Sequence, residues 1–256
     1  MLEKIIRVVR QAGEMIRDVH NVTDNITEKS SHIDVVTQYD TAVQEFLHRE
    51  LLRLMPEAGF LGEEGAHEEI STEWTFIVDP IDGTANFVRN FGHSNISVAL
   101  ARNGISEYGV VYNPYRDELF AAQRGCGATC NGRPIRVSEA EPSHSILLCG
   151  STAYDRELTD RHFAIMRTLY DRVGDFRRLG AAALDLCYIA AGRVEVFFEC
   201  RLRPWDIAAG SLILTEAGGK VTQMDGTPLD VLHNCSVFAT NAKCCGLLAD
   251  IQKFLP

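Results

Sequence analysis

Apolar residues recur every three to four positions in two stretches near the start of the chain. The first stretch holds Leu2, Ile5, Ile6, Val9, Ala12 and Ile16, and the second holds Val43, Phe46, Leu47, Leu51 and Leu54. This spacing puts the apolar side chains on one face of a helix, so each stretch predicts a helix. Between them, Asp34–Thr37 is a short β-rich run and predicts a strand.

The middle of the chain has the pattern of short strands. The apolar run Trp74–Val78 is followed by three β-rich runs, namely Ile96–Ala101, Tyr108–Tyr112 and Leu119–Ala122. Turn-forming pairs separate or follow these runs: Asn103-Gly104, Asn113-Pro114 and Asn131-Gly132. Short strands joined by tight turns are typical of an antiparallel meander.

Helical and strand patterns alternate after about Ser145. The predicted strands are Ile146–Cys149 and Val194–Phe198, and the predicted helices are Thr159–Tyr170, Ala181–Ala191 and Ile207–Ala217. No repeat, low-complexity tract or Pro-rich linker divides the chain. We therefore predict one α/β domain over residues 1–256, with sheets layered between helices, divisible into subdomains at 1–142 and 143–256.

Composition and charge narrow the function classes. The chain has 256 residues, 46% of them hydrophobic and 23% charged, as in ordinary globular proteins. Its formal net charge of −10 argues against nucleic acid as the main partner. No uncharged apolar stretch reaches the ~18 residues of a spanning helix, so no membrane partner is expected. With no signal-peptide pattern and no paired-cysteine zinc motif among eight cysteines, we expect a cytoplasmic enzyme with reduced cysteines.

Acidic residues stand where predicted strands end or helices begin. They are Asp40, Glu63, Glu64, Asp79, Asp82 and Asp206, of which Asp206 takes a predicted N-cap position. Taken singly, each is typical of a turn or a cap. If they converge, their repulsion must be relieved by protons or cations, and Mg²⁺ prefers a few carboxylates with water and phosphate oxygen.

Gly83-Thr84 directly follows Asp82, where the backbone can turn into a helix. Amides at the start of a helix bind phosphate. Two cations about 3.5–4 Å apart can activate water on one side and neutralise the leaving oxygen on the other. The sequence thus predicts metal-assisted chemistry on a phosphate ester.

Three segments together resemble the signature set of the inositol monophosphatase family. They are Gly62-Glu63-Glu64, Asp79-Pro-Ile-Asp-Gly-Thr-Ala-Asn-Phe87 and Trp205-Asp-Ile-Ala-Ala-Gly210. Weaker matches, among them Asp34–Asp40 and Glu216–Gly219, extend the resemblance over essentially the whole chain. It implies a layered αβαβα sandwich, a Mg²⁺-dependent and lithium-sensitive phosphatase, and a homodimer.

The resemblance also implies the metal ligands. Glu63, Asp79 and the carbonyl group of Ile81 would hold the ion that activates the attacking water. Asp79, Asp82 and Asp206 would hold a second ion at the leaving oxygen, and Glu63 would share a third. Two or three Mg²⁺ ions per site are therefore expected.

Other roles follow from the same resemblance. Thr84 would orient the water and act with Glu63 and Asp79 in catalysis, while the amides of Gly83 and Thr84 bind the phosphate. Attack would be direct and in line, without a phosphoenzyme. Asp40 and Lys29 are expected beside the metal site.

On the substrate side, the resemblance places Gly180, Ala181, Ala182 and Glu199 against the alcohol, with Asp82 and Asp206 also facing the substrate. A glutamate can accept hydrogen bonds from neighbouring hydroxyl groups of a sugar or cyclitol. The family usually carries Thr or Ser where this chain has Ala181, so one hydroxyl contact is missing. Arg203 could reach a second anionic group or a neighbouring subunit.

Inositol 1-phosphate is the first substrate expected, with fructose 1,6-bisphosphate, 3′-phosphoadenosine 5′-phosphate and NADP as rivals. A haloacid-dehalogenase-type phosphatase also uses Asp-Gly-Thr, but it needs Asp-x-Asp, and Pro80 with Ile81 makes the spacing one residue too long. A further alternative is a regulatory binding protein that keeps the fold without catalysis. Measuring Mg²⁺-dependent phosphate release separates that alternative from an enzyme.

Overall fold

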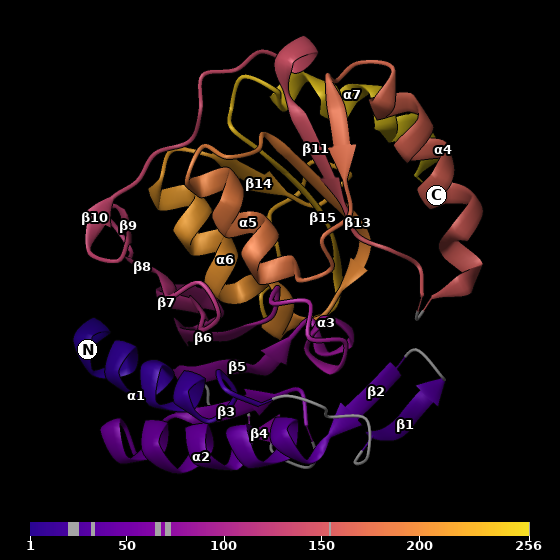
Figure 1. Cartoon of the computed structure of the whole chain (residues 1–256). Coiled ribbons are helices and arrows are strands. Elements are labelled where there is room, and N and C mark those ends of the chain that lie inside the picture. Colours follow the sequence, from indigo (N-terminus) through magenta and orange to yellow (C-terminus); the bar gives the residue numbers. More distant parts are fainter. Residues whose placement is uncertain (20–25, 32–33, 65–67, 70–72, 154, 256) are drawn as a thin grey trace.

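An eight-stranded and a five-stranded β-sheet lie between layers of helices in the computed structural model (Figure 1), and two further strands form a separate two-stranded sheet. The structure describes residues 1–19, 26–31, 34–64, 68–69, 73–153 and 155–255. The fold is mixed α/β with sheets between helices, as the sequence predicts. The layers run in the order helices, sheet, helices, sheet, helices.

The first helical layer consists of α1 (Leu2–Glu14) and α2 (Gln38–Leu54), as the apolar spacing predicts. Their buried faces pack against the larger, eight-stranded sheet in one apolar cluster. The predicted strand at Asp34–Thr37 is β2, and it pairs antiparallel with β1 (Ile26–Ser31). The sequence did not predict β1, because this strand has a single apolar residue and no alternation to detect.

The larger sheet has eight strands in the order β10-β9-β8-β7-β6-β5-β3-β4. The strands are β3 (Gly59–Gly62), β4 (Glu68–Glu69), β5 (Trp74–Asp82), β6 (Asn95–Arg102), β7 (Ile105–Asn113), β8 (Glu118–Gln123), β9 (Ala128–Cys130) and β10 (Arg133–Pro134). Strands β5 to β10 pair antiparallel with their neighbours in chain order, which confirms the meander. Both Asn-Gly turns have positive φ at each residue, the geometry that such hairpin turns require.

The smaller sheet has five strands in the order β12-β11-β13-β15-β14. These are β11 (Ile146–Cys149), β12 (Asp175–Arg177), β13 (Val196–Leu202), β14 (Lys220–Thr222) and β15 (Cys235–Thr240). One face packs against α4 (Thr159–Tyr170) and α7 (Leu248–Ile251). Short 3₁₀ segments lie at Pro142–His144, Arg156–Leu158, Cys245–Leu247 and Gln252–Phe254.

The middle layer consists of α5 (Ala182–Ala190) and α6 (Pro204–Glu216), which lie between the two sheets (Figure 1). Every residue of α5 is buried, as expected of a helix covered on all sides. One apolar cluster joins both helices to both sheets. Among the described residues, no helix has the length and apolarity needed to cross a membrane.

The larger sheet is built from residues before position 143 and the smaller sheet from residues after it. The apolar cluster of the middle layer nevertheless contains residues from both sides of that position, such as Ile77 and Ala209. Helix α6 also approaches β7 closely, since a Cβ on Gly109 would lie 2.8 Å from the carbonyl oxygen of Ala209. Whether the two parts behave as subdomains stays a prediction.

Two predicted boundaries are wrong in ways that affect the site. Helix α6 begins at Pro204 rather than Ile207, because proline fits the first helical position with its fixed φ. Asp206 is therefore the third residue of the helix, and Arg203 is the N-cap. Strand β13 runs on to Leu202, which places Glu199 within the strand instead of after it.

Candidate active site

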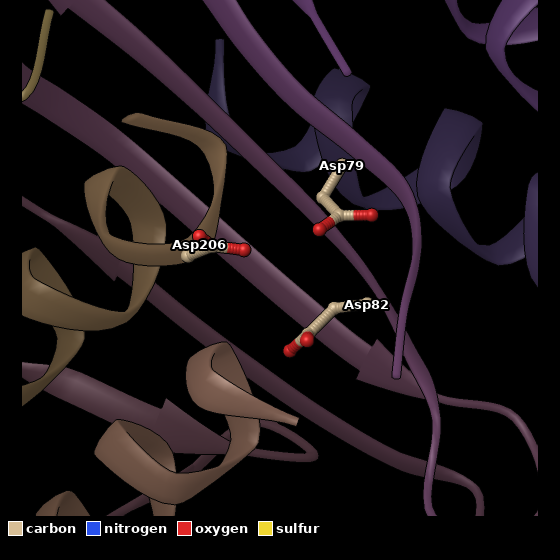
Figure 2. A group of neighbouring side chains, drawn as sticks. All are labelled: Asp79, Asp82 and Asp206. Carbon is tan, nitrogen blue, oxygen red and sulfur yellow. The ribbon is translucent and has the colours of Figure 1, made fainter. Parts of the chain in front are cut away.

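Three aspartates converge where β5 ends and α6 begins. Asp79 and Asp82 come from β5, and Asp206 comes from the first turn of α6. One carboxylate oxygen of each lies within 4.8 Å of the other two, and Figure 2 shows the three side chains directed toward a common space. They line a cavity of about 470 Å³, together with Glu63 and Thr84.

Asp82 is fixed by three hydrogen bonds. Asn95 Nδ2 donates to Oδ2 at 2.7 Å, and the backbone amides of Ala182 and Ala183 donate to Oδ1 at 3.2 Å and Oδ2 at 2.9 Å. The start of α5 therefore holds a carboxylate of the larger sheet in place. The N–H of Ala182 points at Asp82, although Ala182 also lines the cavity.

Short local hydrogen bonds set the other two carboxylates. The backbone N–H of Ile81 donates to Asp79 Oδ1 at 3.0 Å. The backbone N–H of Arg203 donates to Asp206 Oδ2 at 2.7 Å, which ties the helix start to its own third residue. Both contacts use one oxygen of each carboxylate, and no donor among the described residues bonds to the other oxygen and competes with a ligand.

Burial and mutual repulsion disfavour the charged forms of this cluster. Burial, followed by the charges of Glu63 and Asp82, holds the pKa of Asp79 well above its usual range. Burial and the charge of Asp82 do the same to the pKa of Asp206. The pKa of Asp82 is also raised by burial, against the lowering effect of its hydrogen bonds from Asn95 and Ala183.

The donor set fits a hard divalent cation. In the part of the chain that the structure describes, no lysine or arginine forms an ion pair with Asp79, Asp82 or Asp206. Oxygen-only ligands of this kind suit Mg²⁺. A bound cation would also relieve the repulsion between the carboxylates, which contributes to their raised pKa values. Glu63 lines the same cavity at the end of β3, so the structure brings together all four predicted acidic ligands.

Thr84 begins the short helix α3 (Thr84–Val88) after Gly83, whose φ of 83° lies in the left-handed region. Thr84 Oγ1 lies 3.3 Å from Asp40 Oδ1 and 3.1 Å from the carbonyl oxygen of Ile81. A Cβ on Gly83 would lie 3.1 Å from each of two backbone oxygens. Both the positive φ and the lack of space therefore favour glycine at this position. The side chain of Lys29 lies outside the described residues, so its predicted place beside the site is not described.

The predicted substrate residues Gly180, Ala181, Ala182 and Glu199 all line the same cavity. The backbone N–H of Ser151 donates to Glu199 Oε1 at 3.0 Å. Burial raises the pKa of Glu199 to about 8. Arg203 also lines the cavity.

Several residues of the site were not predicted from the sequence. A side chain at Gly150 would clash with the Glu199 carboxylate, so this glycine makes room for it. Asn86 Nδ2 donates to the carbonyl oxygens of His93 and Leu179 at 2.8 Å each, which ties α3 to the loops before β6 and α5. Asn86 lies within the Asp79–Phe87 motif, whereas no sequence signal marks the remaining ones, namely Asn95, Gly150, Ser151, Arg178 and Asp185.

The model of the inositol monophosphatase family matches residues 1–254. A curated relative, Nus factor SuhB of Pasteurella multocida (strain Pm70), is 41% identical over 229 residues, which cover 88% of this chain and 86% of that protein. The solved Thermotoga maritima IMPase is 32% identical with a TM-score of 0.89, covering 99% of this chain and 97% of the other. An IMPase/NADP phosphatase solved with Mg²⁺ and phosphate is 26% identical with a TM-score of 0.84, covering 97% and 93%.

Proposed function

Because the chain belongs to the inositol monophosphatase family, we propose that it is a Mg²⁺-dependent phosphomonoesterase. Its substrate would be a small phosphorylated polyol, with inositol 1-phosphate preferred. The observation that carries the proposal is the cluster of Asp79, Asp82 and Asp206 in the wall of one cavity. A solved relative that holds Mg²⁺ and phosphate supports the same assignment.

The proposed ligands of the metal are Glu63, Asp79, Asp82 and Asp206, with the carbonyl group of Ile81. When bound, Mg²⁺ supplies Lewis-acid stabilisation of phosphate charge and lowers the pKa of a bound water. These ligands would hold two ions, or three if Glu63 shares a third ion. The protein contributes by orienting Asp82 through the bonds from Asn95 and the start of α5, which also act to lower its pKa against the effect of burial.

Thr84 is proposed to orient the attacking water. Its hydroxyl group has one proton, which it can donate either to Asp40 or to the carbonyl oxygen of Ile81. Its lone pairs then remain to accept a hydrogen bond from the water. The amides of Gly83 and Thr84 are proposed to bind the phosphate, and attack would be direct.

Glu199 is proposed to accept hydrogen bonds from hydroxyl groups of the alcohol. Its carboxylate belongs to the wall of the cavity and occupies the space that Gly150 leaves open. Ala181 supplies no hydroxyl group, so the rival substrates fructose 1,6-bisphosphate, 3′-phosphoadenosine 5′-phosphate and NADP stay as alternatives. Arg203 would favour those that carry a second anionic group.

The test is a kcat/KM panel over inositol 1-phosphate and the three rivals, with and without Mg²⁺. We expect phosphate release that requires Mg²⁺ and is fastest with inositol 1-phosphate. If one of the rivals is hydrolysed faster, that compound becomes the proposed substrate and the proposed reaction is unchanged. Absence of release across the panel, in protein shown by calorimetry to bind Mg²⁺, would overturn the enzyme assignment.

Two other mechanisms are separated by simple controls. Covalent chemistry of the haloacid-dehalogenase type predicts an aspartyl-phosphate that can be trapped, whereas direct attack predicts none. Homodimer formation, lithium inhibition and cytoplasmic location stay predictions. Light scattering and the same assay with Li⁺ measure the first two.

The relatives named Nus factor SuhB favour a second candidate, a Nus-factor role that does not depend on catalysis. Its test is complementation of a bacterium that lacks its own SuhB, with wild-type protein and with Asp82→Asn. Equal complementation by both would assign a non-catalytic role. Complementation by the wild type alone would tie the role to the acidic site.

A further inference from the structure

One buried carboxylate in the cavity wall has no part in the proposed function. Asp185, in the first turn of α5, is 1% exposed and lines the same cavity as Glu199. Its Oδ1 is enclosed, and in the described part of the chain it has no hydrogen-bond partner. The enclosed Nε2 of His93 lies 3.9 Å away, too far for a direct bond.

A buried carboxyl group of this kind is unfavourable unless a ligand or another residue supplies a hydrogen-bond donor. Burying an ionisable carboxyl without a partner costs free energy, and buried polar groups in folded proteins are nearly always paired. Burial, with the charge of Asp82, holds the pKa of Asp185 well above its usual range. Oδ1 lies toward His93 and Asp185 itself lines the cavity, so Oδ2 is the oxygen that we assign to a ligand there.

The surroundings of Asp185 show which kind of donor fits. Arg178 also lines the cavity, lies against Gly180 and donates to Ser151 Oγ at 3.2 Å. Its charge acts on both Asp185 and Glu199. A guanidinium group on this wall repels a further cation, whereas an uncharged O–H donor meets no repulsion.

We propose that Asp185 is a specificity-determining residue that, together with Glu199, accepts hydrogen bonds from two hydroxyl groups of the alcohol. The inference rests on the proposed function and names the substrate class of that site. It selects a phosphate ester whose alcohol carries at least two free hydroxyl groups. The second carboxylate acceptor also supplies a contact on a wall where Ala181 has no hydroxyl group.

The test compares inositol 1-phosphate with p-nitrophenyl phosphate, whose leaving group has no further hydroxyl. Losing a buried hydrogen-bond partner is costly enough that Asp185→Ala should lower kcat/KM for inositol 1-phosphate by about 10- to 100-fold, mainly through KM. Asp185→Asn keeps the shape and an acceptor oxygen, so its fall should be smaller. The value for p-nitrophenyl phosphate should change less than about threefold in both variants.

Glu195→Gln is the matched control. Glu195 is also a buried carboxylate, 6% exposed, but it accepts from Ser138 Oγ and the backbone N–H of Ile146 away from the cavity. This variant should leave the ratio of the two substrates unchanged. An equal fall with both substrates in Asp185→Ala, or no fall with either, would overturn the proposal.

A measurement on the wild-type protein covers the case in which the variants do not fold. Single-deoxy analogues of inositol 1-phosphate should reveal two hydroxyl groups whose removal each lowers kcat/KM about tenfold or more. Glu199→Ala should abolish one of these losses and keep the other. A single sensitive hydroxyl group would refute the role of Asp185, whereas wild-type protein that hydrolyses neither ester would refute the proposed function itself.

Discussion

At the scale of single residues, the site depends on carboxylates that are costly to hold ionised. Asp82 accepts hydrogen bonds from one side-chain donor and from two backbone amides at the start of α5, and these bonds offset part of that cost. The same three bonds fix its orientation. A cation placed among the three aspartates would then find its ligands already arranged.

Asp82→Asn should lower turnover more than about 100-fold, since changes even to groups around a metal ligand cost 10- to 100-fold. The fold should survive. The new amide oxygen can accept from α5, and a rotated Asn95 can offer Oδ1, which has no partner among the described residues. Thermal melting in EDTA should show a Tm equal to or above that of the wild type, because a buried charge is gone.

Turnover near the wild-type level would contradict the assignment of Asp82 as a ligand. Glu195→Gln serves again as the control, since it removes a buried carboxylate outside the cavity. It should retain Mg²⁺-dependent activity if folded. Calorimetric titration with Mg²⁺ provides a second readout for both variants.

At the scale of elements, the position of Asp206 depends on how closely α6 approaches the larger sheet. Gly109 of β7 provides the space, because a Cβ there would lie 2.8 Å from the carbonyl oxygen and 3.2 Å from the Cα of Ala209. Ala209 lies one turn after Asp206. Any shift of α6 at this contact therefore moves a proposed metal ligand relative to β5.

Gly109→Ala should displace α6 and so lower both stability and Mg²⁺ affinity. Overpacking of this kind typically costs about 1–3 kcal/mol, or several degrees in Tm. Mg²⁺ affinity from calorimetry should fall together with the Tm. Gly246→Ala is the control, because a Cβ at that position meets nothing within 4 Å and its φ is not positive.

Unchanged Mg²⁺ affinity in a destabilised Gly109→Ala protein would show that the packing of α6 against β7 does not affect the metal site. It would also show that Asp206 is positioned by its local bond to Arg203 alone.

At the scale of the whole molecule, buried acids link stability to pH. The pKa values of Asp79, Asp82, Asp185, Asp206 and Glu199 are all raised, chiefly by burial. Between their ordinary pKa values and the raised ones, the folded state binds more protons than the unfolded state. Their stabilising contribution is therefore complete at low pH and is lost as pH rises through the raised values, for Glu199 about 8.

Metal-free protein should accordingly lose several degrees in Tm between pH 7 and pH 8.5. The window starts at pH 7 because histidines are then mostly neutral in both states. Saturating Mg²⁺ should flatten the slope by stabilising the ionised aspartates. Glu199→Gln in EDTA should show a smaller slope than the wild type, and a Tm that rises with pH would contradict the raised values.

Much of the fold could be predicted from the sequence because its periodicities are local. The helical spacing from Leu2 to Ile16 and the Asn-Gly turns of the meander each report their own backbone geometry. Strand β1 and the true start of α6 were missed for equally local reasons. One has almost no apolar residues, and the other begins at a proline that lies before the apolar run.

The sequence alone also predicted the type of chemistry, since Glu63, Asp79, Asp82 and Asp206 lie in recognisable motifs. Only the tertiary structure decided what surrounds these carboxylates. Asn95, the amides of α5, Gly150 and Asp185 come from separate segments, and no local pattern records their meeting. The physical reason is that burial and partner atoms, which set pKa and orientation, arise when the two sheets close on the helices between them.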